Sequence, residues 1–394
     1  MTSTIGRNGV ELAQRAASSL SSRGIAASHA VTTQLARVGM PSARALGAAV
    51  EDIRRRTAGS LHLRDGFFHN HDEPSAPAVD ADMRVVLDMA RNPGHPRRPV
   101  PVWTPRFDEA PGDLRVTWLG HASALVELDG VRILTDPVFG RRCSPSQLVG
   151  PARMHRSPVA VADLPPLDVV LISHDHYDHL DMGTVLALAA AQPQVRFVAP
   201  VGVGAHLHTW GVGLDRIVEA DWWNAVTVTC GTTEITFTCT PARHFSGRWL
   251  TRNLTQWASW SVAGPTHRFF FSGDTGFSEH FEEVGARLGP FDLTLIAVGA
   301  YDPLWPDVHV DPEEAVTIHR MLSREHLRDA VMVPIHWGTF NLARHTWGDP
   351  IQRLLPNAAT NGATVLVPPP GGTIDLGNRT GTGVAHPSWW EPSA

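Results

Sequence analysis

Four potential metal ligands lie close together in residues 173–181, whose sequence is SHDHYDHLD. A short apolar run, which predicts a buried strand, leads directly into them. His174 and His176 are two positions apart, so an extended backbone directs both rings to the same side, and Asp178 and His179 follow on the turn into the next predicted helix. Imidazole nitrogen and carboxylate oxygen suit zinc, and four such ligands in one loop exceed what a single tetrahedral ion takes there. The pattern therefore predicts two metal ions.

Three more potential ligands stand at the ends of other predicted strands: His244, Asp274 and His336. A lone His is more often satisfied by ordinary hydrogen bonds, so each of the three is a weak signal by itself. The alternative for the loop, a solvated polar turn, is disfavoured because desolvating so many His and Asp groups without a metal is costly. Taken together, the seven residues indicate one shared metal centre.

Short strands and turns around these residues would hold them in place. Hairpin turns are expected at Asp129-Gly130 and around Gly264-Pro265. A helix start is expected at Asp311, with Pro and Glu at the favoured positions after it. A helix is also expected at 182–190, and two late strands, at 363–367 and 373–376, are expected to close the second sheet. The pattern alone predicts a mixed α/β domain with much sheet.

Longer motifs surround the seven residues and support a resemblance. They are TWLGHA (117–122), LTDP (134–137), SPSQ (144–147), FFSGDTG (270–276), GAY (299–301), HVDPEEA (309–315) and IHWGTF (335–340). With the metal loop, this series resembles the metallo-β-lactamase superfamily of hydrolases. The longer stretches resemble its N-acylphosphatidylethanolamine-hydrolysing phospholipase D branch. The likeness covers roughly residues 95–376.

The resemblance implies an α/β (α+β) fold, the αββα sandwich with an N-terminal extension, and two zinc ions per chain, with iron and manganese as alternatives. It implies that His174, His176 and His244 hold one ion. It further implies that Asp178, His179 and His336 hold the other and that Asp274 bridges both. A hydroxide between the ions would be the nucleophile, since zinc lowers the pKa of bound water to about 7.

The same resemblance implies a phospholipase D reaction on N-acylphosphatidylethanolamine, giving phosphatidic acid and an N-acylethanolamine. His309 matches a headgroup-contacting residue and would bind the phosphate or protonate the leaving group, beside the catalytic carboxylates Asp178 and Asp274. Val308 departs from the mammalian enzymes, which carry a polar Gln there, so headgroup recognition is expected to differ in detail. Further residues are expected to contact the substrate: Tyr177, Arg248, Trp249, Tyr301 and Trp305.

Two residues are expected behind the ligands. The resemblance implies that Asp136 orients a ligating His, as carboxylates that accept the other ring N–H do; alternatively, it begins a turn before Pro137. His121, in the first motif, is likewise expected to contact a ligand and not the metal.

Other functions of the same fold remain open. A sugar-phosphate lactonase shares the short motifs, and an iron-dependent redox enzyme shares the metal loop, although di-iron flavoproteins usually carry Glu at position 176. A non-enzymatic membrane scaffold is a third alternative. RNA cleavage is disfavoured because the formal net charge is −6 and the interval from Asp274 to His336 leaves no room for an RNA-clamping insertion.

Composition sets the organisation of the chain. Its 394 residues, 43% hydrophobic, can bury a large core. The three cysteines offer no disulfide framework, which is typical of a reducing compartment, and no apolar run reaches membrane-spanning length. A cytoplasmic protein, peripheral to the membrane at most, is therefore expected. Expected segments are an Ala/Arg/Ser-rich extension (1–66), a linker packed on the domain (67–112), the hydrolase domain (113–377) and a loose tail (378–394).

The N-terminal extension is open to three interpretations. Its eight arginines in the first 60 residues, against three acidic residues, are typical of a solvated, partly disordered arm that contributes little to the core. Alternatively, such an arm lies on anionic lipid or on a partner subunit in a homodimer. An organellar transit peptide has a similar composition and is the third alternative. No nucleic-acid partner is expected.

Overall fold

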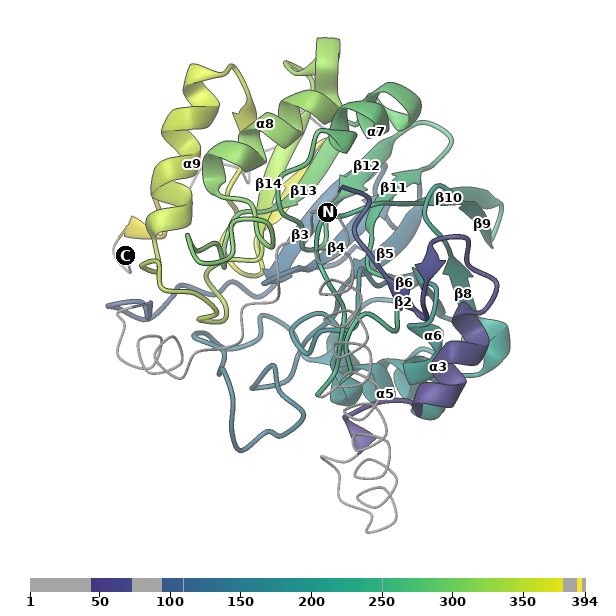
Figure 1. Cartoon of the computed structure of the whole chain (residues 1–394). Coiled ribbons are helices and arrows are strands. Elements are labelled where there is room, and N and C mark those ends of the chain that lie inside the picture. The colour runs from purple at the N-terminus through teal and green to yellow at the C-terminus, as the bar shows by residue number, and fades with distance from the viewer. Residues whose placement is uncertain (1–43, 73–93, 109, 250, 378–387, 392–394) are drawn as a thin grey trace, which may run out of the picture.

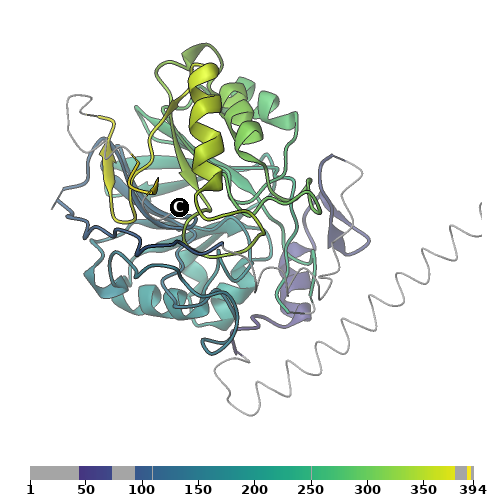
Figure 2. The same cartoon turned by 90° about the vertical axis from the view of Figure 1, so that its left-hand side faces the viewer.

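The computed structural model describes residues 44–72, 94–108, 110–249, 251–377 and 388–391. Two seven-stranded sheets pack face to face, and helices cover the outer side of each sheet (Figures 1 and 2). The αββα sandwich is therefore confirmed.

The first sheet carries the strand that leads into the metal loop. The hairpin at Asp129-Gly130 is confirmed as an antiparallel pair, and the strands beyond it run parallel to one another. Across the sheet the order is β16 (Thr373–Asp375), β3 (Leu114–Gly120), β4 (Ser123–Leu128), β5 (Val131–Thr135), β6 (Val169–Leu171), β7 (Arg196–Pro200) and β8 (Ile217–Ala220).

The second sheet carries the strands that precede the other three candidate ligands. Its hairpin around Gly264-Pro265 is also confirmed, and β12 to β15 are parallel. Across the sheet the order is β15 (Thr364–Val365), β14 (Val331–Ile335), β13 (Leu293–Ala297), β12 (Arg268–Phe271), β11 (Ser259–Ala263), β10 (Thr233–Thr240) and β9 (Ala225–Cys230).

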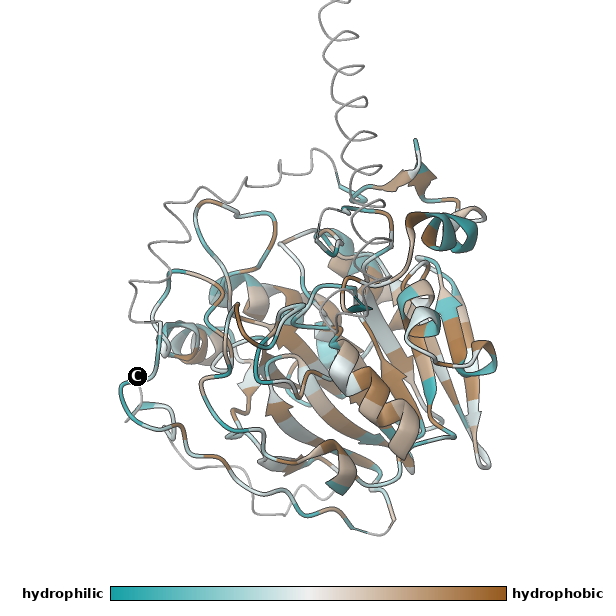
Figure 3. Ribbon diagram, turned by 90° about the horizontal axis from the view of Figure 1, so that it is seen from below, coloured by the Kyte–Doolittle hydropathy of each residue, from teal (hydrophilic) through white to brown (hydrophobic). Residues whose placement is uncertain are grey.

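Both faces of the central strands are apolar, because each sheet packs against the other sheet on one side and against helices on the other. In β4, Ala124 and Val126 belong to the core between the sheets, whereas Leu125 belongs to a separate cluster with Leu188. Leu188 lies on α5, so the alternation of side chains along the strand supplies both layers. Figure 3 shows the resulting brown, hydrophobic strands.

The helices flank the sheets in two groups. Helix α8 begins with a capping box between Asp311 and Glu314, as the sequence predicted. On one outer side lie α5 (Met182–Ala191) and α6 (Gly204–Thr209), and on the other α7 (His280–Leu288), α8 (Pro312–Ser323) and α9 (Asp349–Thr360) (Figure 1). Short 3-10 turns are η1 (Val161–Asp163), η2 (Leu214–Arg216) and η3 (Arg324–His326).

One strand assignment was wrong. Residues 373–375 were expected to close the second sheet with β15, but β16 pairs with β3 in the first sheet, with Ile374 opposite Val116. The two strands are joined by a turn of Pro and Gly residues, in which Gly372 and Gly371 bond to the backbone of Trp118. The chain therefore crosses from one sheet to the other, which strand patterning alone does not specify.

The described parts of the extension and of the tail pack on the domain, which differs from the solvated arm and the loose tail that the sequence suggested. Helix α3 (Val50–Thr57) buries Val50 and Ile53 against Leu254, and a two-stranded hairpin of β1 (Leu63–Arg64) and β2 (Phe67–Phe68) follows. Near the C-terminus, Trp389 packs on Trp337 with ring centroids 5.5 Å apart. Residues 1–43, 378–387 and 392–394 lie outside the described residues.

Within the part of the chain that the structure describes, no helix has the length and apolar character needed to cross a membrane.

Ile53→Ala tests the role of α3. Because Ile53 is 1% exposed, the substitution should lower the free energy of unfolding by about 2–4 kcal/mol. The exposed neighbour Arg54 supplies the control, and Arg54→Ala should change the free energy by less than about 0.5 kcal/mol in urea titrations. Equal stability of the two variants would show that α3 is not part of the folded core.

Candidate metal centre

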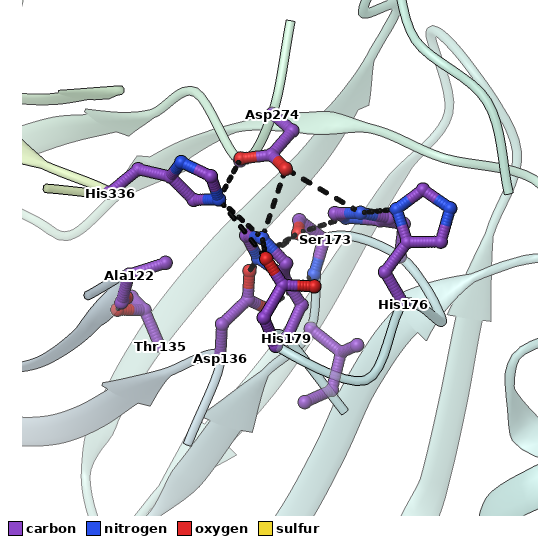
Figure 4. Close-up of polar contacts among 12 residues, drawn as sticks. Ala122, Thr135, Asp136, Ser173, His176, His179, Asp274 and His336 are labelled. Carbon is purple, nitrogen blue, oxygen red and sulfur yellow. Dashed lines mark hydrogen bonds and ion pairs between the residues drawn. The ribbon is translucent and has the colours of Figure 1, made fainter. Parts of the chain in front are cut away.

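The seven predicted ligands meet at one edge of the sandwich, where several strands end. The metal loop follows β6, Asp274 follows β12 and His336 follows β14, while His244 lies just beyond β10. These ends lie together because β12 runs parallel to its neighbour β13 and β13 to β14, β10 is antiparallel to β11 and β11 to β12, and the two sheets are stacked. Figure 4 shows the side chains of Asp274, His336, His176 and His179 converging there.

The first group of donors consists of His174, His176, His244 and Asp274, whose ligand atoms all lie within 4.8 Å of one another. His176 Nδ1 is 2.8 Å from His174 Nε2 and 3.3 Å from His244 Nε2. Asp274 Oδ2 lies 3.8 Å from His174 Nε2 and 3.7 Å from His244 Nε2. Three ring nitrogens and one carboxylate oxygen thus surround a single point.

The second group contains Asp178, His179 and His336, with His121 behind them. His336 Nε2 is 3.1 Å from His179 Nε2 and 3.3 Å from Asp178 Oδ2. Asp274 again faces this group, with Oδ1 3.1 Å from His336 Nε2 and Oδ2 3.0 Å from His179 Nε2. The Asp274 carboxylate therefore stands between the two groups.

The chemistry of these donors fits divalent cations. Burial lowers the pKa of His174 and of His244 well below the usual value, so both rings are neutral and carry a free lone pair at neutral pH. Burial acts in the same direction on His336, but the charge of Asp274 and the hydrogen bonds to Asp178 and Asp274 together outweigh it and raise the pKa of His336 to about 9. Asp274 Oδ1 has no hydrogen-bond partner. Lone pairs and carboxylates facing one another at such distances are stabilised by a metal ion.

Asp136 holds His179 from behind. Its Oδ2 is 2.6 Å from His179 Nδ1, and its Oδ1 accepts the backbone N–H of Ser173 at 2.7 Å. The Ser173 hydroxyl donates to Oδ2 of the same carboxylate. Of the two interpretations of Asp136, the structure supports the carboxylate that orients a ligand (Figure 4).

His121 lies against the second group. Its Nε2 is 3.0 Å from Asp178 Oδ2, and its ring centroid is 4.0 Å from that of His336. Burial lowers the pKa of His121 to about 3, so the ring is neutral. The Thr339 hydroxyl accepts the backbone N–H of His121 at 2.7 Å and fixes its position.

His309 borders both groups. Its ring centroid lies 5.2 Å from those of His244 and His336, and its Nδ1 is 3.9 Å from Asp274 Oδ2. Burial lowers the pKa of His309 to about 4. Its side chain is partly exposed, as a group that meets a substrate must be.

Arg248 does not lie where the sequence predicted. It was expected to contact a charged headgroup, but its side chain is 1% exposed and its N–H groups donate to backbone carbonyls. Tyr177, also expected to contact substrate, has its ring 4.1 Å from the Arg248 guanidinium carbon. The side chain of Arg248 points into the protein, where backbone carbonyls accept hydrogen bonds from its guanidinium.

The remaining predicted contacts divide between the surface and the interior. Trp249 is 58% exposed beside the metal centre. Trp305 is half-buried and donates from Nε1 to Ala300 O at 2.8 Å. Tyr301 is buried, donates its hydroxyl to Asp349 and stacks on His345, so its hydroxyl is engaged within the fold.

Some residues that support the centre were not predicted. Asn70 Oδ1 accepts the backbone N–H of His244 at 2.9 Å and the Trp257 Nε1 proton at 3.0 Å. Asp175 is buried inside the metal loop and accepts from Gly247 N at 2.7 Å. Gly273 has φ +54°, and a Cβ there would come within 2.5 Å of the Ser173 side chain. The glycine beside Asp274 was a visible signal, whereas Asn70 carried none.

The comparison with protein families identifies the class. Residues 131–337 match the model of the beta-lactamase superfamily domain, and the chain belongs to this superfamily. Its fold and its clustered His and Asp side chains, which are suited to binding metal, are those of a metallohydrolase.

Relatives place it within that superfamily. An uncharacterised protein of Mycobacterium tuberculosis (strain ATCC 25618 / H37Rv) is 48% identical over 369 residues, covering 92% of this chain and 96% of the relative. The N-acyl-phosphatidylethanolamine-hydrolyzing phospholipase D 1 of Caenorhabditis elegans is 40% identical over 234 residues, 58% of this chain and 64% of the relative. The resemblance to this branch is therefore confirmed.

Solved structures show the same fold at low identity. An isothiocyanate hydrolase from Delia radicum gut bacteria is 19% identical, with a TM-score of 0.52 over 66% of this chain and 98% of that chain. A metallo hydrolase from the archaeon Ignicoccus hospitalis is 22% identical, with a TM-score of 0.50 over 66% of this chain and 97% of that chain.

Asp274→Ala tests the shared carboxylate. Because Asp274 faces both groups, the variant should lose metal from both and should retain less than about one hundredth of the hydrolytic activity. Metal per chain is measured by elemental analysis after dialysis. A variant that keeps the wild-type metal content and turnover would contradict a shared role for this residue.

Proposed function

We propose that this protein is a binuclear zinc hydrolase of phospholipase D type that cleaves N-acylphosphatidylethanolamine to an N-acylethanolamine and phosphatidic acid. The observation that carries the proposal is the position of Asp274 between two groups of His and Asp donors. Its Oδ2 lies 3.0 Å from His179 Nε2 in one group and 3.7 Å from His244 Nε2 in the other. Two metal ions a few ångströms apart suit the displacement of a phosphodiester oxygen, because both the attacking and the leaving oxygen carry charge.

The proposed ligand sets follow the two groups. His174, His176 and His244 would hold one ion, and Asp178, His179 and His336 the other, with Asp274 shared. When bound, such ions supply Lewis acidity and a nucleophilic hydroxide at neutral pH. Similar His and carboxylate donors also bind iron and manganese. Elemental analysis of the purified protein therefore decides the identity of the metal.

His309 is the residue placed to handle the phosphoryl group. It lies between His244 and His336, and its lowered pKa makes it neutral at pH 7. A neutral imidazole donates one hydrogen bond, so His309 would orient a phosphoryl oxygen and would not pair with it as a cation. Beside it, the backbone carbonyl oxygen of Val308 lies 3.0 Å from His244 Nδ1.

An apolar cleft beside the metal loop supports a lipid substrate. It has a volume of about 660 Å³, and Asp181, at the end of the metal loop, lies in its wall with Met182 of α5. Ala45, Phe139, Pro145 and Leu148 add apolar surface. Burying an acyl chain stabilises a complex by about 0.8 kcal/mol per CH₂, so such a cleft would favour long-chain substrates.

Exposed apolar side chains point to contact with a membrane surface. Trp249 is 58% and Leu304 is 48% exposed, on loops that carry or adjoin His244 and His309. Their placement supports a protein that binds peripherally to a phospholipid surface and takes its substrate from it. The Caenorhabditis elegans relative is named for hydrolysis of the same substrate class.

A substrate panel tests the proposal. The purified protein, with its metal content measured, is incubated with N-acylphosphatidylethanolamine, unmodified phosphatidylethanolamine, a sugar-phosphate lactone and a soluble aryl phosphodiester. Release of N-acylethanolamine and phosphatidic acid, lost on chelation and restored by zinc, is the expected result. Turnover of the lactone with no phospholipid cleavage would contradict it.

Trp249→Ser combined with Leu304→Ser tests the membrane approach. The double variant should lose about tenfold or more of its activity on N-acylphosphatidylethanolamine in vesicles, because two exposed apolar contacts are removed. It should keep most of its activity on the soluble aryl phosphodiester and its full metal content. Equal losses on both substrates would show that these side chains support the fold and do not serve the lipid.

A further inference from the structure

We infer that Arg248 is a positioning residue for the metal loop: its guanidinium holds the backbone on both sides of the candidate ligands His176, Asp178 and His179. The inference rests on the proposed metal site. It assigns Arg248 a role different from the substrate contact that the sequence suggested.

The hydrogen bonds of Arg248 bracket the loop. Its Nη1 donates to Asp175 O at 2.6 Å and to Leu180 O at 2.9 Å. These two carbonyls stand on either side of the ligand-bearing turn, so one nitrogen closes it. The loop between them cannot open without breaking one of these bonds.

The other side of the guanidinium is anchored outside the loop. Nε and Nη2 donate to Ala45 O at 3.2 and 2.8 Å. The guanidinium carbon lies 4.1 Å from the Tyr177 ring centroid and 5.1 Å from the Trp210 ring centroid. Arg248 is thus held from several directions, and it links the segment before α3 to the metal loop.

The acceptors show what the residue does. Among the described residues, no carboxylate oxygen forms an ion pair with Arg248, and the acceptors of its guanidinium are backbone carbonyls. Burying a cation is costly unless its donors are satisfied, and a planar fork satisfies several fixed carbonyls at once. The arrangement therefore fixes backbone geometry and does not pair charges.

Additional bonds hold the first end of the same turn. The Asp175 carboxylate accepts from Gly247 N at 2.7 Å and from Thr255 Oγ1 at 2.9 Å, and it lies 3.2 Å from His206 Nε2. His206 Nδ1 in turn accepts the backbone N–H of Ala48 at 2.9 Å. The second end, at Leu180, depends on Arg248 and on its own N–H bond to His176 O. Loss of Arg248 should therefore mainly displace Asp178 and His179, which lie next to the less strongly held end of the turn.

The chain offers a matched control in Arg216. Its guanidinium also donates to backbone carbonyls, those of Val195, Ala189 and Gln192, and it lies 5.7 Å from the ring centroid of Phe197. Arg216 has no contact with the candidate ligands. A change to Lys at either position removes the planar fork and keeps the charge.

Two variants, Arg248→Lys and Arg216→Lys, are compared with the wild-type protein. Metal binding is measured as zinc and cobalt affinity and as the visible spectrum of the cobalt-loaded protein. Activity is measured as kcat and KM, and stability by thermal unfolding of the full chain. For Arg248→Lys we expect metal affinity to fall about 10- to 100-fold, as for other groups that orient ligands. The cobalt spectrum should change and kcat should fall with KM unchanged. Arg216→Lys should change only the thermal midpoint.

Two results would overturn the inference. A raised KM with wild-type metal affinity would assign Arg248 to substrate binding, and a lowered thermal midpoint with unchanged metal affinity and spectrum would assign it to stability alone. If Arg248→Lys does not fold, Trp210→Leu loosens the guanidinium without touching the metal loop and should lower metal affinity in the same direction. Failure of the wild-type protein to bind two metals would instead contradict the proposed function.

Discussion

The structure depends on bringing seven imidazole and carboxylate groups to one buried edge, where they have little water to solvate them. Such groups are costly to bury when they face one another without a counter-ion. His176 Nδ1 lies within hydrogen-bonding distance of ring nitrogens of both His174 and His244. The second group repeats this pattern, with His336 Nε2 close to His179 Nε2. Metal ions remove this conflict, and the rest of the fold can be understood as the support that keeps the donors in register.

That support comes from three sources. Parallel strands end at the same edge and deliver Asp274, His336 and the metal loop. Carboxylate and amide side chains, Asp136 and Asn70, hold ligands from behind. A third source is the segment around Ala45, which reaches the metal loop through the carbonyl that Arg248 binds. The described segment around Ala45 is therefore connected to the metal loop through Arg248.

The sequence predicted most of what depends on local pattern. The ligand residues stood at strand ends, and the hairpins and the capping box of α8 carried recognisable turn and cap residues. What it did not predict depends on distant contacts. Arg248 beside Trp249 suggested a substrate contact, because a sequence does not show that carbonyls of the metal loop and of the segment before α3 meet one guanidinium. Residues 373–375 had a strand pattern, yet their sheet was set by pairing with β3. The packing of α3 on the core was not predicted either, because the helix carries three arginines, although Val50, Ile53 and Thr57 share one buried face.

The central claim, that Asp274 is shared between two metal ions, is tested most directly by a crystal structure of the zinc-loaded protein with anomalous diffraction measured on both sides of the zinc absorption edge. The account predicts two anomalous peaks per chain, one beside His174, His176 and His244 and the other beside Asp178, His179 and His336, with an Asp274 oxygen at ligand distance from each. A single peak, or two peaks of which Asp274 touches one, would contradict it.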